Sequence, residues 1–405
     1  MSPTFLVVLL SLLLGLQPLT TDLYLPALPA ITDFFGADPG KVQLTLSALI
    51  LSFGLSQLVW GPVSDRYGRK PVMLLGLMLY TLAALGSSLA ASLEALILWR
   101  ILQGAAMGAA IMCGRALVRD LFDDPVRGAR VMSLGLSGLG ILACLGTPLG
   151  GALMQWFGWR ETLFFLALFG GAVLLLASLR MQETLAAPNH DALRPTRLFG
   201  IWKTILGHST FWAFALLQVG SYAGLFVFLV SSSFVFIRVL DVSALGYGLL
   251  MFSMSFFYIV GTLICRRLLL HFSVTATVAL GGLCALLGGG LLLLSVLLEW
   301  PGIWAVMLPV YLFVISHGIN QPCSHSGVMQ PFPHSAGAAT ALSSVVMVLV
   351  AFVVGLLLGE GLSEPLLPMA VGIGSSGVFV AAVAWLLVPM AARSSERAAH
   401  QTAVE

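Results

Sequence analysis

Residues 61–71 read GPVSDRYGRKP, a short charged segment between two long apolar runs. Asp65, Arg66, Arg69 and Lys70 fall within this segment, although only 9% of the whole chain is charged and 59% is hydrophobic. Ionised side chains are costly inside the hydrocarbon core of a bilayer. The segment is therefore predicted to be a loop outside the membrane, and the runs on either side of it are predicted to cross the membrane.

The composition of the chain indicates an integral membrane protein. The mean hydropathy over 405 residues is +1.01, and only 9% of the residues are charged. In a typical soluble domain about a quarter of the residues are charged. The net charge of +2 is scattered, so no nucleic-acid partner is expected. The five cysteines occur singly, without metal-ligand spacing, so they are interpreted as small packing residues and no metal is expected. No cofactor is expected either.

Apolar runs long enough to span a bilayer occur about twelve times. A helix needs about 20 such residues to cross a hydrocarbon core of about 30 Å, and backbone groups in lipid must hydrogen-bond within their own segment. The first run has no preceding Lys or Arg and no clean cleavage site after it, so it is expected to remain in the mature protein. The predicted spans are residues 4–24, 41–61, 71–91, 94–117, 129–153, 160–180, 209–231, 243–265, 274–297, 302–322, 336–359 and 366–388.

A polar stretch from Gln182 to His208 divides the chain almost in half. Apolar residues between Leu198 and Leu206 recur there at helical spacing opposite Arg197 and Lys203, as in a helix lying on a membrane surface. The predicted organisation is a six-helix bundle over 1–181, a cytoplasmic linker with this amphipathic helix over 182–208, a second six-helix bundle over 209–389 and a cytoplasmic tail over 390–405.

The distribution of Lys and Arg among the loops predicts the orientation. With the N-terminus in the cytoplasm, fourteen of these residues lie on the cytoplasmic side, and only Lys41, Arg160 and Arg238 lie on the other. Because the number of spans is even, both termini are predicted to be cytoplasmic.

Arg100 stands out because it lies within the fourth apolar run. Gln103 and Met107 extend its helix face, while Gly104 and Gly108 form a small-residue stripe for close helix packing. Arg100 could simply snorkel toward the outer interface. The preferred interpretation is the fixed cation of a proton-linked site.

Other titratable residues in the apolar runs have more than one explanation. Asp22, near the outer end of the first run, could be a polar helix end or a titratable acid in a cavity. Arg115 could snorkel toward the cytoplasm, bond neighbouring carbonyls or line the cavity. His317 and His325 flank the inner end of the tenth run, where a hydrogen-bonded structural residue is expected more often than a proton carrier.

Motifs of soluble enzymes are absent from the sequence. It contains no HExxH, GxSxG or GxxxxGK[ST] pattern. The glycine-rich run from Gly135 to Gly140 lies inside an apolar run with no strand before it, so it is interpreted as a site of backbone packing. An enzyme is not expected.

Residues 61–71 resemble the signature loop of the major facilitator superfamily. The matching residues are Gly61, Asp65, Arg66, Gly68, Arg69 and Lys70. Arg100-x-x-Gln103-Gly104 resembles the fourth-helix motif of the drug–proton antiporters in that superfamily. The run to Gly151 resembles their fifth-helix antiporter motif, with Ala152 in place of the usual second glycine; its residues include Gly138, Gly146, Pro148 and Gly151.

Two further segments, residues 21–29 and 115–120, resemble the bicyclomycin/chloramphenicol-resistance (Bcr/CflA) branch. The resemblance implies an all-α membrane protein of the major facilitator fold in a bacterial inner membrane, with two six-helix bundles around a cavity. It also implies that Asp65 and Arg69 close a cytoplasmic gate with Asp120 as a partner of Arg69. Asp22 would be the proton-responsive acid, and Arg100 its electrostatic partner.

These features predict a monomeric proton-coupled antiporter, surrounded by membrane lipids, that exports neutral or zwitterionic amphiphiles resembling chloramphenicol or bicyclomycin. A transporter of one specific metabolite is the alternative, and a membrane-embedded enzyme is a remote one. The residues proposed to line the cavity, besides Arg115, are mostly aromatic, thioether or amide side chains that adapt to apolar ligands. They are Tyr24, Gln57, Gln103, Met107, Met112, Gln218, Tyr222, Phe226, Phe228, Tyr258 and Asn320.

Overall fold

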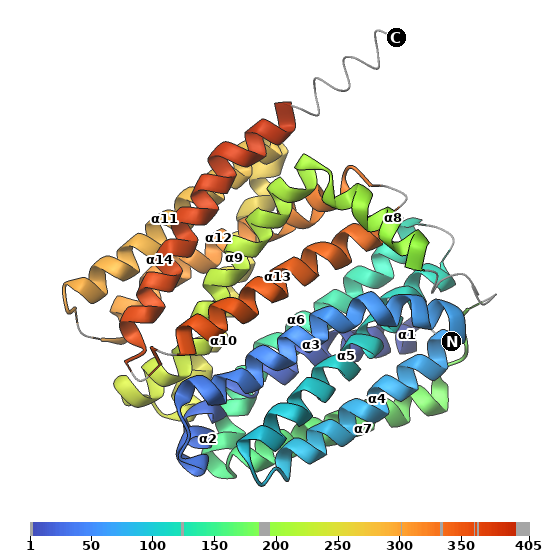
Figure 1. Ribbon diagram of the computed structural model, residues 1–405, viewed down its shortest axis with the longest axis horizontal. Helices are drawn as coiled ribbons and strands as arrows, with labels where there is room; N and C mark the ends of the chain where they lie inside the picture. The colour runs from blue at the N-terminus through green and yellow to red at the C-terminus, as the bar shows by residue number, and fades with distance from the viewer. Residues whose placement is uncertain are drawn as a thin grey trace. The chain divides into compact units, whose positions relative to one another are not determined.

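The computed structural model describes residues 3–122, 125–185, 195–300, 302–332, 335–359, 361–362 and 364–393. These ranges contain helices and no strand, and 12 helical segments are long and apolar enough to cross a membrane (Figure 1). The prediction of an all-α membrane protein with about twelve spans is confirmed. The elements are α1 (Pro3–Asp22), η1 (Leu25–Ala27), α2 (Leu28–Phe35), α3 (Pro39–Tyr67), α4 (Arg69–Ser88), α5 (Leu93–Leu121), α6 (Pro125–Trp156), α7 (Trp159–Arg180), α8 (Pro195–Leu206), α9 (Ser209–Ser233), η2 (Phe234–Val239), α10 (Ala244–His271), α11 (Val274–Leu297), α12 (Ile303–Met329), α13 (Ala336–Gly359), α14 (Leu366–Ala382) and η3 (Val383–Leu387).

The chain forms two compact units, and each has its own helix packing. The first comprises Met1–Pro195 and Asp241–Phe252, and the second comprises Thr196–Leu240 and Ser253–Glu405. In the first unit, α5 packs against α3 and α4, α4 packs against α7, and α1 packs against α6. In the second unit, α11 packs against α12 and α14, and α9 packs against α12, α13 and α14. The bundle and linker boundaries expected from the sequence stay a prediction.

The expected loop between the second and third spans is almost entirely helical. α3 continues past Pro62 to Tyr67 and α4 begins at Arg69, so Gly68 alone separates the two helices. Gly68 has φ 104° and ψ 154°, a conformation that is open to glycine because it has no Cβ. The predicted extent of the loop is wrong because hydropathy indicates where a segment leaves the lipid, not where its backbone stops being helical.

Small residues on α5 allow α3 to approach closely. A Cβ atom at Gly104 would clash with the carbonyl oxygen of Leu49, and one at Gly108 would clash with Oγ of Ser56. The predicted role of Gly104 and Gly108 in close helix packing is confirmed.

Replacing Gly104 with Ala is expected to lower the melting temperature of the protein. The added methyl group would push α3 and α5 apart. Such overpacking lowers the free energy of unfolding by about 1–3 kcal/mol. Gly140→Ala on α6 is the matched control, because a Cβ there meets nothing within 4 Å and alanine favours the helix. Thermal unfolding of both variants in one detergent checks this, and an unchanged melting temperature for Gly104→Ala would contradict the close contact.

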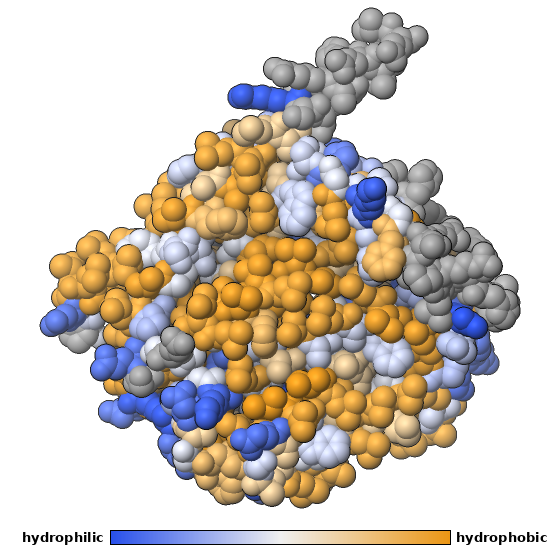
Figure 2. Space-filling model, in the orientation of Figure 1, coloured by the Kyte–Doolittle hydropathy of each residue, from blue (hydrophilic) through white to orange (hydrophobic). Residues whose placement is uncertain are grey.

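Hydrophobic side chains cover much of the face shown in Figure 2. Leu168 and Leu175 on α7, and Leu357 on α13, are among the large apolar residues that are exposed. Large exposed apolar surfaces are rare on soluble monomers and mark contact with a membrane or a partner. This exposure agrees with helices that face lipid.

Candidate functional site

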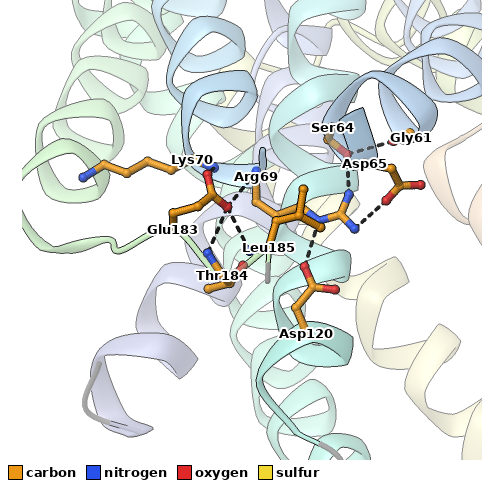
Figure 3. Close-up of polar contacts among 9 residues, drawn as sticks. All are labelled: Gly61, Ser64, Asp65, Arg69, Lys70, Asp120, Glu183, Thr184 and Leu185. Atoms are coloured by element: carbon orange, nitrogen blue, oxygen red, sulfur yellow. Dashed lines mark hydrogen bonds and ion pairs between the residues drawn. The ribbon is translucent and has the colours of Figure 1, made fainter. Parts of the chain in front are cut away.

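A cluster of charges lies where α3 ends, α4 begins and α5 ends (Figure 3). The Arg69 side chain is 2% exposed and forms ion pairs with Asp65 at 2.5 Å and with Asp120 at 2.8 Å. Its Nη1 donates to Oγ of Ser64 at 2.6 Å. The contact between Arg69 and Asp120 that the resemblance implied is present, whereas Ser64 was not anticipated.

The break at Gly68 explains why these side chains meet. The Gly68 N–H still donates to the Ser64 carbonyl at 3.1 Å, which closes the last turn of α3, and α4 starts at the next residue. Asp65 therefore lies in the last turn of α3, close to Arg69 in the first turn of α4. Because α4 and α5 pack together, Asp120 near the end of α5 reaches the same guanidinium.

Glu183, which sequence reasoning did not select, contacts the same region from the segment after α7. Its carboxylate accepts hydrogen bonds from the backbone N–H groups of Arg69 at 2.9 Å and Lys70 at 3.0 Å (Figure 3). Arg66, another signature residue, places its guanidinium 5.5 Å from the centre of the Tyr67 ring.

Asp22 is the last residue of α1, and it is half-buried. Its carboxylate accepts a hydrogen bond from Oγ1 of Thr21 at 3.0 Å. A Cβ atom at Gly146 would lie 3.2 Å from Cβ of Asp22, so α6 passes directly beside this acid. The position agrees with both interpretations of Asp22, the helix end and the cavity acid.

Four residues of the fifth-helix motif lie at helix contacts within the first unit. Gly138 and Gly146 face α1, where a Cβ at Gly138 would clash with the helix. Pro148 and Gly151 lie against the first residues of α10. The motif therefore allows close helix packing on two sides of α6, and one of these contacts is at Asp22.

Arg100 is fully buried and is held mainly by neutral groups. Its Nη1 donates to Oε1 of Gln103 at 2.8 Å, its Nη2 lies 3.5 Å from the Thr20 carbonyl, and its guanidinium is 4.1 Å from the centre of the Tyr24 ring. Within the described ranges, no ion pair joins Arg100 to Asp22 or to another carboxylate, and Nε of Arg100 has no hydrogen-bond partner. The implied partnership with Asp22 is not a direct contact in this structure.

Two hydroxyl pairs surround Arg100. The Tyr24 hydroxyl lies 2.6 Å from Oγ1 of Thr45, and the Tyr80 hydroxyl lies 2.6 Å from Oγ1 of Thr20. Tyr24 was a predicted cavity residue, but Tyr80 carried no recognisable signal in the sequence. These contacts tie α1, α3 and α4 to the region around a cation on α5.

The other cavity candidates of the first unit have different surroundings. Gln57 and Met107 are buried, and the terminal methyl of Met112 lies 3.7 Å from where a Cβ of Gly61 would be. Arg115 is exposed.

In the second unit, the candidates on α9 contact neighbouring helices and one another. Nε2 of Gln218 lies 3.7 Å from Sδ of Met347 on α13, and the Tyr222 and Phe226 rings stack with centroids 6.2 Å apart. Phe228 is buried.

The predicted cavity residues on α10 and α12 are Tyr258, which lies near His317, and Asn320, which lies near Gly281. The Tyr258 ring is 5.8 Å from the imidazole of His317, whose Nδ1 is 2.8 Å from Oγ of Ser221. His317 is thus hydrogen-bonded, as expected. The Asn320 side chain packs against the position of Gly281 on α11, at a contact between two helices.

Comparisons with known proteins agree with this architecture. A family model described as Major Facilitator Superfamily matches residues 10–356. Multidrug resistance protein D of Escherichia coli (strain K12) is 32% identical over 344 residues, which cover 83% of this chain and 84% of that protein. The chloramphenicol resistance protein of Pseudomonas aeruginosa is 28% identical over 331 residues, which cover 81% of this chain and 77% of that protein. A solved D-xylose-proton symporter has a TM-score of 0.73 at 16% identity, over 96% of this chain and 99% of that one, which shows likeness of fold.

Proposed function

Because the chain belongs to the Major Facilitator Superfamily, we propose that it is a proton-coupled antiporter that exports amphipathic drugs by alternating access. The chain is a multi-pass membrane transporter of small molecules and not an enzyme. Two relatives are named for multidrug and chloramphenicol resistance, which supports drugs as the substrate class. Among drugs, neutral or zwitterionic amphiphiles are the proposed substrates. The proposed state is a monomer in a bacterial inner membrane, with both termini in the cytoplasm.

The observation that carries the coupling proposal is the buried cation beside the helix that bears Asp22. Arg100 has no carboxylate partner among the described residues and contacts the carbonyl of Thr20, two positions before Asp22. A nearby cation favours the ionised form of an acid, whereas burial favours its neutral form. A helix movement that changes this balance at Asp22 would load or release a proton.

In the proposed cycle, substrate and proton compete for one cavity. A proton from outside reaches Asp22 and substrate leaves; after inward opening, Asp22 releases the proton and substrate binds. The charges around Arg69 would close the cytoplasmic gate during part of this cycle. The burial of Arg69 and its ion pairs with Asp65 and Asp120 support that role.

Transport by the purified protein in proteoliposomes tests this function. Vesicles that are acidic inside should accumulate chloramphenicol as protons leave, and a protonophore should abolish the accumulation. Liposomes without protein are the control. Accumulation of a metabolite but of no drug would contradict the proposal. Drug uptake at the same rate with and without the pH gradient would also contradict it.

A further inference from the structure

Glu183 connects the segment that follows α7 to the start of α4. Besides the N–H groups of Arg69 and Lys70, its carboxylate accepts hydrogen bonds from the N–H groups of Thr184 at 2.9 Å and Leu185 at 3.0 Å. The first N–H groups of a helix lack partners within the helix, and the helix N-terminus carries partial positive charge. Gly68 has no side chain to cap α4, so this distant carboxylate acts as the cap.

The ionisation of Glu183 agrees with this arrangement. Burial opposes the charge, but the four backbone N–H groups outweigh it and hold the pKa of the carboxyl below its ordinary value. Because the folded-state pKa is lowered, the stabilisation is fully present above the ordinary glutamate pKa. It is lost only as the pH falls through the lower folded-state value, so the cap stays charged near neutral pH.

Gly68 makes room for the carboxylate as well as for the break between helices. A Cβ atom at Gly68 would lie 2.6 Å from Oε2 of Glu183, far closer than ordinary van der Waals contact. The same residue has a positive φ of 104°. The glycine of the signature segment therefore serves both the turn and the approach of Glu183.

We propose that Glu183 is a positioning residue of the transport cycle. By capping α4 it fixes the backbone of Arg69, and so it places the guanidinium between Asp65 and Asp120. Because Glu183 lies in the segment directly after α7, its contact connects the end of α7 to the charge cluster. This inference rests on the transport function proposed above.

The first test compares Glu183→Gln with Glu94→Gln, a control that removes an exposed acid from the first turn of α5. Glu183→Gln should lower the maximal transport rate while substrate affinity stays unchanged, and Glu94→Gln should change neither. Amide exchange at Arg69 and Lys70 should accelerate about tenfold in Glu183→Ala, the effect of losing a typical cap. A variant that loses this protection but transports at the wild-type rate would show a purely structural cap and overturn the proposal.

The second test is a double-mutant cycle with Gly68. Gly68→Ala should reduce the transport rate more in the wild-type background than in Glu183→Ala, where the added methyl no longer meets the carboxylate. Additive effects would overturn the proposal. The exchange measurement needs no transport, so retained exchange protection in Glu183→Ala refutes the cap directly, whereas absence of proton-coupled transport in the wild type refutes the proposed function.

Discussion

Replacing Asp22 with Asn is expected to abolish proton-driven drug export while the protein still folds and inserts. Asparagine has nearly the same shape and can still accept the hydrogen bond from Thr21, but it cannot take up a proton. One charge that crosses 100 mV provides about 2.3 kcal/mol, which sustains roughly a 50-fold substrate gradient. The variant should therefore lose the whole gradient.

Two measurements in proteoliposomes separate coupling from binding. Accumulation of chloramphenicol under a pH gradient should vanish in Asp22→Asn, whereas substrate counterflow, which needs no net proton movement, should persist. Asp33→Asn, at an exposed acid on α2, is the matched control and should behave like the wild type. Drug resistance and substrate-induced proton release at wild-type levels in Asp22→Asn would refute the role of this acid.

Replacing Arg69 with Ala is expected to slow turnover strongly without removing substrate binding. The change leaves Asp65 and Asp120 without the cation they share. Removing one partner of a fully buried ion pair lowers the free energy of unfolding by about 3–5 kcal/mol. The loss of stability in Arg69→Ala should be smaller, because the side chain of Asp65 is 36% exposed and solvent partly screens its charge.

The comparison needs a variant that keeps the charge and one that removes a cation elsewhere. Arg69→Lys should be intermediate, because an ammonium lacks the planar fork that serves both carboxylates at once. Arg180→Ala, at an exposed position in the last turn of α7, should transport normally. Substrate binding and transport rate are measured on the same purified samples, and loss of binding in a well-folded Arg69→Ala protein would show that the cluster is not a gate.

The spans could be predicted from the sequence because helix length and hydropathy, which define a span, are local signals. The contact between Arg69 and Asp120 was implied only by the family resemblance of the signature segment and of residues 115–120. The cap could not be predicted, because Glu183 lies 114 positions after Arg69. An isolated acid after an apolar helix resembles any solvated residue, and only the packing of α4 against α7 places it.

The site at Arg100 shows a different limit of sequence reasoning. Two opposite charges among apolar runs suggest an ion pair, since charges in a bilayer usually have partners. In the structure, Arg100 instead meets the Tyr24 ring, Gln103 and a carbonyl oxygen. A polar neutral environment of this kind depends on the rotation of each helix about its axis, which hydropathy does not specify.

The single-residue break between α3 and α4 also affects how the protein should respond to proteases. Trypsin cleaves after Lys and Arg in extended, locally unfolded chain. Arg66 and Arg69 would be ordinary cleavage sites in a loop, but they lie in helical turns on either side of Gly68. The bond after Lys70 is not a tryptic site, because Pro71 follows it. Digestion after Arg66 or Arg69 should therefore occur only when this corner unfolds, so its rate reports how often the helical turns beside Gly68 open.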